Sequence, residues 1–499
     1  MKTTGNRAII IGSGVAGLAA AIRLAVKGYE VTVMERNSSA GGKLRMREEN
    51  GYLFDLGPSL FTQPQNIVEL FALAEEPIED YFSFRNVPIS CKYFYPNGKQ
   101  VNAYTQADAF AKELAEQVNE DPDAVRAYLR DANDLYAHVG QIFVNHSLHK
   151  RKTWLHKRIL PALKQSSWQH LFRSMHRFNQ KRFKQPETVQ LFNRYATYNG
   201  SNPYQAPAML TLIPHLELNE GTFYPQGGMI SITRALQALA EKKGVQFRFN
   251  TSVDRIIHHE GRVRGVVAEG INYDADIVVS NADIYFTYLH LLQDSYRAKK
   301  VLRQERSSSA FIFYWGIGTS FPELHLHNIF FSNEYKTEFD SLFKGTAWPN
   351  DPTVYINITS KMEEGQAPAG KENWFVMVNA PAHRGQNWDA ITDKLRDLVL
   401  NKIEARLGKP VRPFIETEFT LTPAGIEQQS SSYMGSLYGT SSNSRFAAFL
   451  RHPNFSTHIR GLFCCGGSVH PGGGIPLCLK SGQIVADLVP NPTAAKSHA

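Results

Sequence analysis

A glycine pattern near the N-terminus constrains the fold of this chain more than any other feature. It fits G-x-G-x-x-G and consists of Gly12, Gly14 and Gly17. Residues 8–11 before it are apolar, and residues 18–27 after it have the composition of a helix. A second apolar run, residues 29–34, ends at Glu35, near the spacing at which an acidic side chain meets a ribose in dinucleotide-binding units. The pattern predicts a strand–helix–strand unit that binds a dinucleotide.

Each glycine has a separate physical purpose in such a unit. Gly12 permits the tight turn, Gly14 lets the backbone approach a pyrophosphate, and Gly17 lets the helix pack against the strand. The free N–H groups and the positive dipole end of the helix favour a phosphate. A purely structural glycine turn is the competing interpretation, and the unit alone does not distinguish FAD from NAD.

Two further glycine-rich segments could meet a cofactor. Near the N-terminus, Gly41-Gly42-Lys43-Leu44 precedes residues 54–59, which end in Gly57-Pro58-Ser59. Near the C-terminus, an apolar run and glycines at 461–474 precede a helical stretch that we expect to begin near Pro476. In isolation each segment reads as an ordinary loop, but their order along the chain is informative.

Together these motifs resemble the bacterial carotenoid desaturases of the phytoene desaturase type. The resemblance runs in order from about residue 8 to residue 490, and its motifs are residues 8–35, 41–43, 54–59, 223–229, 276–283 and 470–476. It implies an α/β chain with a discontinuous Rossmann-like FAD-binding domain, an antiparallel-sheet substrate domain and a helical membrane-associating region.

The resemblance also implies the cofactor and its contacts. FAD would be bound without a covalent link, with Val253 beside the adenine and Lys43 in place of the arginine more usual there. Lysine keeps the charge but loses the bidentate fork. The predicted FAD contacts are Gly12, Ser13, Gly14, Val15, Ala16, Gly17, Glu35, Arg36, Gly42, Lys43, Leu44, Gly57, Pro58, Ser59, Val253, Gly467, Ile475 and Pro476.

The implied activity is desaturation of a carotenoid, with a quinone or O2 as the final electron acceptor. Residues 57–64 are closer to the branch that 3,4-desaturates 1-hydroxylated carotenoids than to the phytoene-desaturating branch. A phytoene- or lycopene-type desaturase, a carotenoid isomerase, a flavin amine oxidase and a lipid- or prenyl-binding protein remain alternatives. No catalytic base can be named, and His470 is either an acid–base group or a pocket-shaping side chain.

The motifs divide the chain into three predicted parts. The FAD-binding domain takes residues 1–65, 225–290 and 455–490, the substrate domain takes 66–105 and 291–454, and a helical, membrane-associating region takes 106–224. Four cysteines, including the adjacent pair Cys464 and Cys465, are too few and badly placed for a disulfide framework or a metal site.

A local basic patch accounts for the net charge of +8. No acidic residue occurs between Asp134 and Glu187, where eleven lysines and arginines lie. Apolar and basic side chains recur there at helical spacing, as in helices that lie in a membrane interface. A buried core stripe is the competing interpretation, and no nucleic-acid-binding module accompanies the patch. We expect peripheral association with the cytoplasmic face of the membrane through Trp168, Phe172, Arg173, Arg177 and Lys181.

Overall fold

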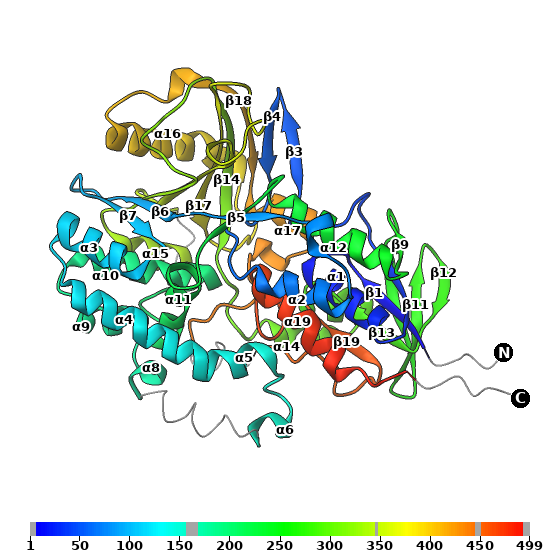
Figure 1. Cartoon of the computed structure of the whole chain (residues 1–499). Helices are drawn as coiled ribbons and strands as arrows, with labels where there is room; N and C mark the ends of the chain where they lie inside the picture. Colours follow the sequence, from blue (N-terminus) through cyan, green and yellow to red (C-terminus); the bar gives the residue numbers. More distant parts are fainter. Residues whose placement is uncertain (1–5, 156–167, 345–347, 445–450, 493–499) are drawn as a thin grey trace, which may run out of the picture.

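A five-stranded parallel sheet lies at the end of the molecule where the two termini emerge (Figure 1). The computed structural model describes residues 6–155, 168–344, 348–444 and 451–492. In sheet order the strands are β19 (Leu462–Cys464), β13 (Ile277–Ser280), β1 (Arg7–Ile11), β2 (Glu30–Met34) and β9 (Gln246–Arg248). Strands from three distant parts of the chain therefore form one Rossmann-like sheet. The exact boundaries of the three parts remain predictions.

After Arg7, strand β1 is apolar because both of its faces are buried. Ala8 and Ile10 pack among the helices α1 (Val15–Val26), α12 (Ile230–Lys242) and α19 (Ile475–Leu488). Ile9 and Ile11 face the other way, toward a three-stranded antiparallel sheet. The strands of that sheet are β10 (Val253–His259), β11 (Arg262–Ala268) and β12 (Ile271–Asp274).

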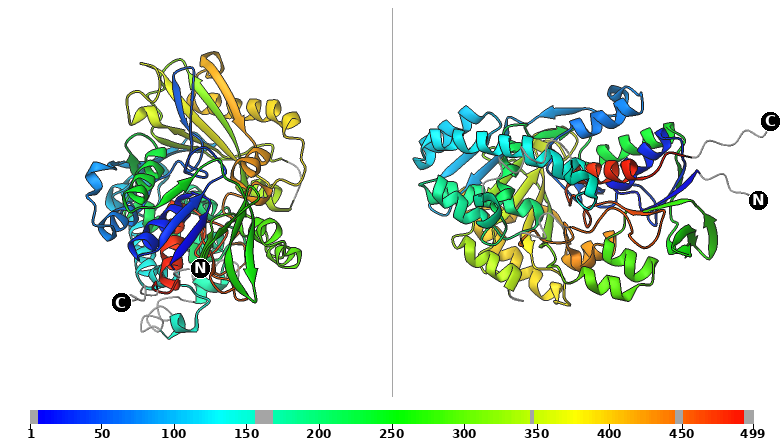
Figure 2. Two further views of the ribbon diagram at one scale, coloured as in Figure 1. Left: turned by 90° about the vertical axis from the view of Figure 1, so that its right-hand side faces the viewer. Right: turned by 90° about the horizontal axis from the view of Figure 1, so that it is seen from below.

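A larger, seven-stranded sheet forms the second half of the molecule (Figures 1 and 2). Its order is β18 (Ile415–Leu421), β14 (Ser309–Ile317), β17 (Glu372–Ala380), β16 (Val354–Ile358), β15 (His327–Phe330), β6 (Ile89–Phe94) and β7 (Gln100–Tyr104). The expectation of a wholly antiparallel sheet is wrong at one pair, because β15 and β6 run parallel. Those two strands are far apart in sequence, so no tight turn dictates their relative direction.

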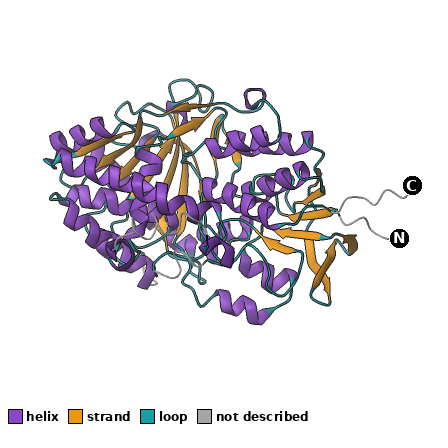
Figure 3. Cartoon of the chain, turned by 60° about the horizontal axis from the view of Figure 1, so that its bottom comes forward, coloured by secondary structure: helices purple, strands orange, loops and turns teal. Residues whose placement is uncertain are grey.

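Helix α16 (Trp388–Leu407) covers one face of this sheet with Leu395, Val399 and Ile403, which pack against the strand core. A group of helices lies on the side of the molecule where the edge strand β7 is found (Figure 1), and all helices of the chain are purple in Figure 3. The helices of this group are α3 (Ala107–Val118), α4 (Pro122–Leu135), α5 (Gln141–Asn145), α6 (Arg151–Trp154), α8 (Trp168–Phe172), α9 (Met175–Arg182), α10 (Pro186–Asn193), α11 (Ile213–Leu218) and α15 (Tyr335–Lys344).

The basic, apolar stripe of this helical region is not one continuous helix, which corrects the predicted spacing. The chain leaves the helix after α8, and Ser174 caps α9 by accepting a hydrogen bond from Arg177 N at 3.3 Å. Met175 and Phe178 are buried in the helical core, so these two apolar positions serve packing. The predicted apolar positions at 159 and 163 and the side chain of Trp168 lie outside the described residues.

Within the described ranges no helix combines the length and the apolar character that crossing a membrane requires.

Candidate functional site

A cavity of about 870 Å³ lies between the two large sheets. It joins the glycine motifs of the parallel sheet to the apolar face of the seven-stranded sheet. The predicted cofactor residues that line it are Gly12, Gly14, Val15, Ala16, Glu35, Arg36, Gly42, Lys43, Leu44, Gly57, Pro58, Ser59, Val253, Gly467, Ile475 and Pro476. Ser13 and Gly17 do not line it but support the turn from behind, as described below.

Two helix N-termini open into the cofactor end of this cavity. Helix α1 begins after Gly14 and helix α19 after Gly474, and neither first residue is capped by a side chain. Neither helix carries an acidic residue in its first turn. Their free N–H groups and dipoles therefore create two places where negative charge is stabilised.

The glycine turn leaves no room for side chains. Gly12 has a φ of +91°, and a Cβ on Gly17 would lie 2.3 Å from the carbonyl oxygen of Gly12. A Cβ on Gly42 would lie 3.2 Å from the Cα of Gly14, so the second glycine pair packs against the first. This arrangement keeps the backbone exposed to a ligand in the way that a pyrophosphate site requires.

Glu35 holds the cofactor loops together as well as facing the cavity. Its Oε2 accepts hydrogen bonds from Ser13 N at 2.9 Å and Ser13 Oγ at 2.8 Å. Its Oε1 accepts from Asn37 N at 2.9 Å and Asn37 Nδ2 at 2.6 Å. The buried carboxylate is therefore fixed at the end of β2, where a ribose hydroxyl can donate to it.

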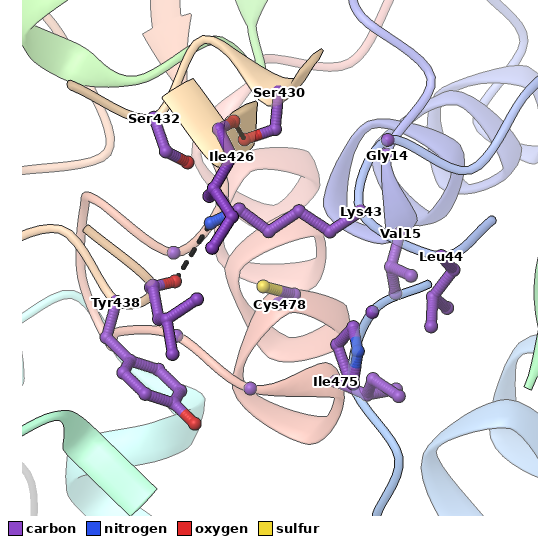
Figure 4. A pocket seen from close by; sticks show the side chains of 18 of the residues that line it. Gly14, Val15, Lys43, Leu44, Ile426, Ser430, Ser432, Tyr438, Ile475 and Cys478 are labelled. Atoms are coloured by element: carbon purple, nitrogen blue, oxygen red, sulfur yellow. Dashed lines mark hydrogen bonds between the residues drawn. The ribbon is translucent and has the colours of Figure 1, made fainter. Parts of the chain in front are cut away.

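Positive charge is concentrated around the cofactor end. Lys43 extends across the cavity and donates from Nζ to the carbonyl oxygen of Leu437 at 2.9 Å, and burial lowers its pKa (Figure 4). Behind the wall, Arg451 donates to the carbonyl oxygens of Tyr438 at 2.7 Å and Gly467 at 3.3 Å. Burial, and then repulsion from Arg306, lowers the pKa of Arg451 to about 10.

Little negative charge offsets these cations. Arg306 pairs with Asp283 at 2.6 Å, but one amino group of Arg306 and one of Arg451 have no hydrogen-bond partner among the described residues. A buried guanidinium N–H without a partner is costly unless an acceptor completes it. An anionic diphosphate and an electron-rich flavin ring supply such acceptors, so the residues present fit FAD.

Sequence reasoning missed several residues at this end. Asn281 Nδ2 donates to the carbonyl oxygen of Gly12 at 3.4 Å and lies against the glycine turn, and Asp283 follows two residues later. Both belong to the motif at 276–283, so the signal was present although neither was predicted to line the site. Residues 426–432, another part of the wall, carried no recognisable pattern.

At the other end of the cavity lies a buried polar cluster, which we call the Arg194–Glu217 cluster. Glu217 accepts hydrogen bonds from Ser90 Oγ at 2.5 Å, Tyr195 OH at 3.1 Å, Arg194 Nη2 at 3.3 Å and Tyr198 OH. Its members come from β6, α11 and the turn after α10, so no sequence spacing could have revealed it.

His470 is a packing residue of the C-terminal loop and does not line the cavity. Its Nε2 lies 2.9 Å from the carbonyl oxygen of His146, and its side chain is completely buried. Burial lowers the pKa of His470 to about 4, so the ring is neutral. Cys464 and Cys465 are also buried and form no disulfide, so they pack as small core residues.

Comparison with known proteins decides the family. The model of the family described as flavin containing amine oxidoreductase matches residues 15–490. The chain belongs to that family. It is therefore a flavin-dependent oxidoreductase, and its cofactor is FAD.

Two relatives are similar to this chain over nearly its whole length. The chain is 50% identical to a 1-hydroxycarotenoid 3,4-desaturase of Flavobacterium sp. over 98% of this chain and 100% of the relative. It is 32% identical to a 4,4'-diaponeurosporene oxygenase of Staphylococcus aureus over 98% of this chain and 99% of the relative. The predicted resemblance to carotenoid desaturases is confirmed.

The similarity to solved structures supports the fold of this chain and is not evidence for its substrate. An oxidoreductase from Methanosarcina mazei matches with a TM-score of 0.63 at 15% identity, over 96% of this chain and 100% of that one. Putrescine oxidase bound to putrescine matches with a TM-score of 0.61 at 14% identity, over 97% and 98% of the two chains. These values place the chain in the α/β fold of FAD-dependent oxidoreductases.

The Glu35→Ala substitution is expected to weaken FAD binding by at least about tenfold, because it removes the ribose acceptor and the anchor of two loops. Titration of the apoprotein with FAD, followed by flavin fluorescence, measures the dissociation constant. Glu35→Gln is the matched comparison, since it keeps one acceptor oxygen and should lose less. An unchanged dissociation constant for FAD in the alanine variant would show that Glu35 does not contribute to the cofactor site.

Proposed function

We propose that this protein is an FAD-dependent desaturase that introduces a C=C bond into a carotenoid drawn from the membrane. The preferred reaction is 3,4-desaturation of a 1-hydroxylated carotenoid, which the relative at 50% identity carries in its name. The observation that carries the proposal is an apolar section of the cavity that adjoins the cofactor end. It is lined by Ala310, Ile312, Ile329, Phe375, Met377 and Leu421.

This section suits a long hydrocarbon. Its residues come from neighbouring strands of the seven-stranded sheet, so they form a continuous wall rather than isolated contacts. A polyene buried along such a wall is held by apolar burial alone, which is roughly proportional to the area removed from water. The same wall excludes water from the reacting carbons.

The site indicates which parts of the reaction the cofactor would supply and which the protein side chains would supply. FAD, when bound, supplies an acceptor for the hydride of one allylic carbon, while the neighbouring carbon loses a proton and the new C=C bond forms. The apolar wall orients the chain so that the reacting carbons face the cofactor. The positive charge of Lys43, Arg306 and Arg451 favours the negative charge that accumulates on reduction. Reoxidation is assigned to a quinone or O2.

A paired desaturation assay tests this function. FAD-loaded protein is added to liposomes that carry a 1-hydroxylated carotenoid with acyclic ends or to matched liposomes that carry phytoene. We expect a red shift and the loss of two hydrogens from the hydroxylated compound alone. Stepwise colour from phytoene alone would assign the enzyme to the phytoene branch, and a spectral change without a mass change would indicate an isomerase.

We also propose that the protein associates with the membrane through the part of the helical region that contains α6, α8 and α9. Trp154, Leu155 and Phe172 are exposed to 52%, 85% and 51%, respectively, which is unusual for large apolar side chains. Phe172 lies on α8, which packs against α9 with its exposed Arg177 and Lys181. Trp154 and Leu155 lie at the end of α6, apart from α9 in Figure 1. Apolar side chains bordered by cations are typical of an interfacial surface, and we assign it to the cytoplasmic face of the membrane.

The triple variant Arg173→Glu, Arg177→Glu, Lys181→Glu is expected to bind liposomes with anionic lipid about 100-fold more weakly, since each cation near such a surface is worth about 1 kcal/mol. Co-sedimentation measures the partition coefficient. The matched control reverses three exposed lysines on other helices, Lys242, Lys299 and Lys394, with the same change in net charge. Equal losses in both triple variants would mean that total charge, rather than this surface, drives binding.

A further inference from the structure

A chain of polar side chains crosses the wall of the cavity where its apolar section meets the cofactor end. Ser59 Oγ lies 2.7 Å from Tyr355 OH, and Tyr355 OH lies 2.8 Å from His327 Nδ1. The three residues come from the loop after β4 (Tyr52–Asp55), from β16 and from β15, and all of them line the cavity. We call them the Ser59–Tyr355–His327 relay.

The protonation of His327 follows from its neighbour on β16. Asn357 donates from Nδ2 to the carbonyl oxygen of Leu326 at 3.2 Å, which fixes the orientation of its amide. The same Nδ2 lies 3.2 Å from His327 Nδ1 and can only donate, so Nδ1 is an acceptor. Burial, and then the charge of Arg194, lowers the pKa of His327 to about 3, so the ring is neutral and its proton resides on Nε2.

This Nε2–H has no hydrogen-bond partner among the described residues, although His327 is only 1% exposed. A buried N–H without an acceptor is costly, and native sites retain one when a ligand or a bound water completes it. Because His327 also lines the cavity, a ligand in the cavity is the acceptor that we expect for this N–H.

A second polar group of the cavity wall, the Arg194–Glu217 cluster, is more fully occupied, although Arg194 Nε has no hydrogen-bond partner among the described residues. Both oxygens of the Glu217 carboxylate already accept hydrogen bonds from protein donors. Arg194 is held among the rings of Tyr93, Tyr195 and Tyr198 and by that carboxylate. Among these lining side chains, His327 therefore offers an unpartnered N–H on a neutral ring, whereas Arg194 offers one on a guanidinium group whose charge Glu217 already pairs.

We propose that the Ser59–Tyr355–His327 relay is the subsite for the substrate's hydroxyl group, with His327 Nε2–H donating to the hydroxyl oxygen. This inference rests on the proposed function and deepens it by naming the residues that select a hydroxylated end. A tertiary alcohol oxygen accepts from Nε2–H, while its own proton is available to the oxygens of the relay.

The position of the relay agrees with the chemistry of the reaction. In a 1-hydroxylated carotenoid, only C2 separates the hydroxyl-bearing C1 from the C3–C4 bond. A hydroxyl subsite must consequently adjoin the cofactor rather than occupy the far end of the cavity. Ser59 is the member of the relay nearest the cofactor end, because it follows Gly57, whose Cβ would lie 1.9 Å from the carbonyl oxygen of Lys43. Tyr355 connects Ser59 to His327, which lies on the side of Arg194.

Substitution of His327 tests the proposal. In FAD-loaded protein, His327→Phe keeps an aromatic ring but removes the donor, and we expect the ratio of kcat/KM for the 1-hydroxylated carotenoid over its hydroxyl-free analogue to fall about tenfold or more. His327→Gln restores an N–H donor and should recover part of the ratio. The dissociation constants of both carotenoids, from quenching of flavin fluorescence, should show the same selective loss.

The matched control is Ile329→Val, two residues along β15 and on the same face of the strand. It enlarges the cavity without altering a hydrogen bond, so both carotenoids should be affected alike. If the wild type selects the hydroxylated carotenoid and His327→Phe keeps that selectivity, the relay is not the hydroxyl subsite although the proposed function stands. If the wild type desaturates neither carotenoid, the proposed function fails, and this inference fails with it.

Discussion

Replacing Glu217 with alanine is expected to lower the free energy of unfolding by about 3–5 kcal/mol, the range for breaking one partner out of a buried ion pair. The substitution leaves Arg194 buried without its carboxylate. It also removes the acceptor of three hydroxyl groups, on Ser90, Tyr195 and Tyr198. The pair itself need not be a net source of stability; the loss comes from the donors left unpaired.

Chemical denaturation followed by tryptophan fluorescence measures this change. Glu116→Ala is the matched control, because Glu116 forms an exposed i, i+4 pair with Lys112 and such pairs contribute less than about 1 kcal/mol. A loss for Glu217→Ala as small as that of the control would contradict the buried network. Glu217→Gln should fall between the two, since the amide retains an acceptor oxygen.

Gly17→Ala is expected to reduce the affinity for FAD by about 100-fold or more, because the new Cβ would lie 2.3 Å from the carbonyl oxygen of Gly12. Helix α1 must then move away from the turn, and overpacking of this kind costs about 1–3 kcal/mol or more. The displacement carries the free N–H groups of α1 out of position for the diphosphate.

Reconstitution of the apoprotein with FAD, followed by absorbance after gel filtration, measures this loss. Val26→Ala serves as the control, since Val26 is 38% exposed at the opposite end of the same helix. The control should take up FAD as the wild type does. A Gly17→Ala protein that retains stoichiometric FAD at low cofactor concentration would show that the turn does not hold the diphosphate.

Local sequence signals were sufficient for the cofactor end of the molecule. The apolar run before Gly12, the glycine spacing and the acid at Glu35 predicted β1, α1 and β2 closely, because each depends on backbone conformation and on burial of both sheet faces. The helix that starts at Ile475 was predicted for the same reason, since glycines and a proline mark its beginning.

The helical region shows where periodicity alone was ambiguous. Met175 and Phe178 satisfy the spacing of an interfacial face equally well, yet they pack into the core. Ser174, as an N-cap, divides the stripe into two helices. Which apolar positions face outward depends on the neighbouring helices, and the sequence pattern does not record those neighbours.

The sequence by itself determined the N-terminal strand–helix–strand unit, the glycine turns and the resemblance that led to FAD, because these features are encoded in short motifs along the chain. Only the tertiary structure decided how the substrate end of the cavity is built. His327, Tyr355 and Ser59 meet from three separate elements, and Arg194 meets Glu217 from two more. Hydrogen bonds between such distant residues depend on strand order and helix packing, which no local spacing specifies.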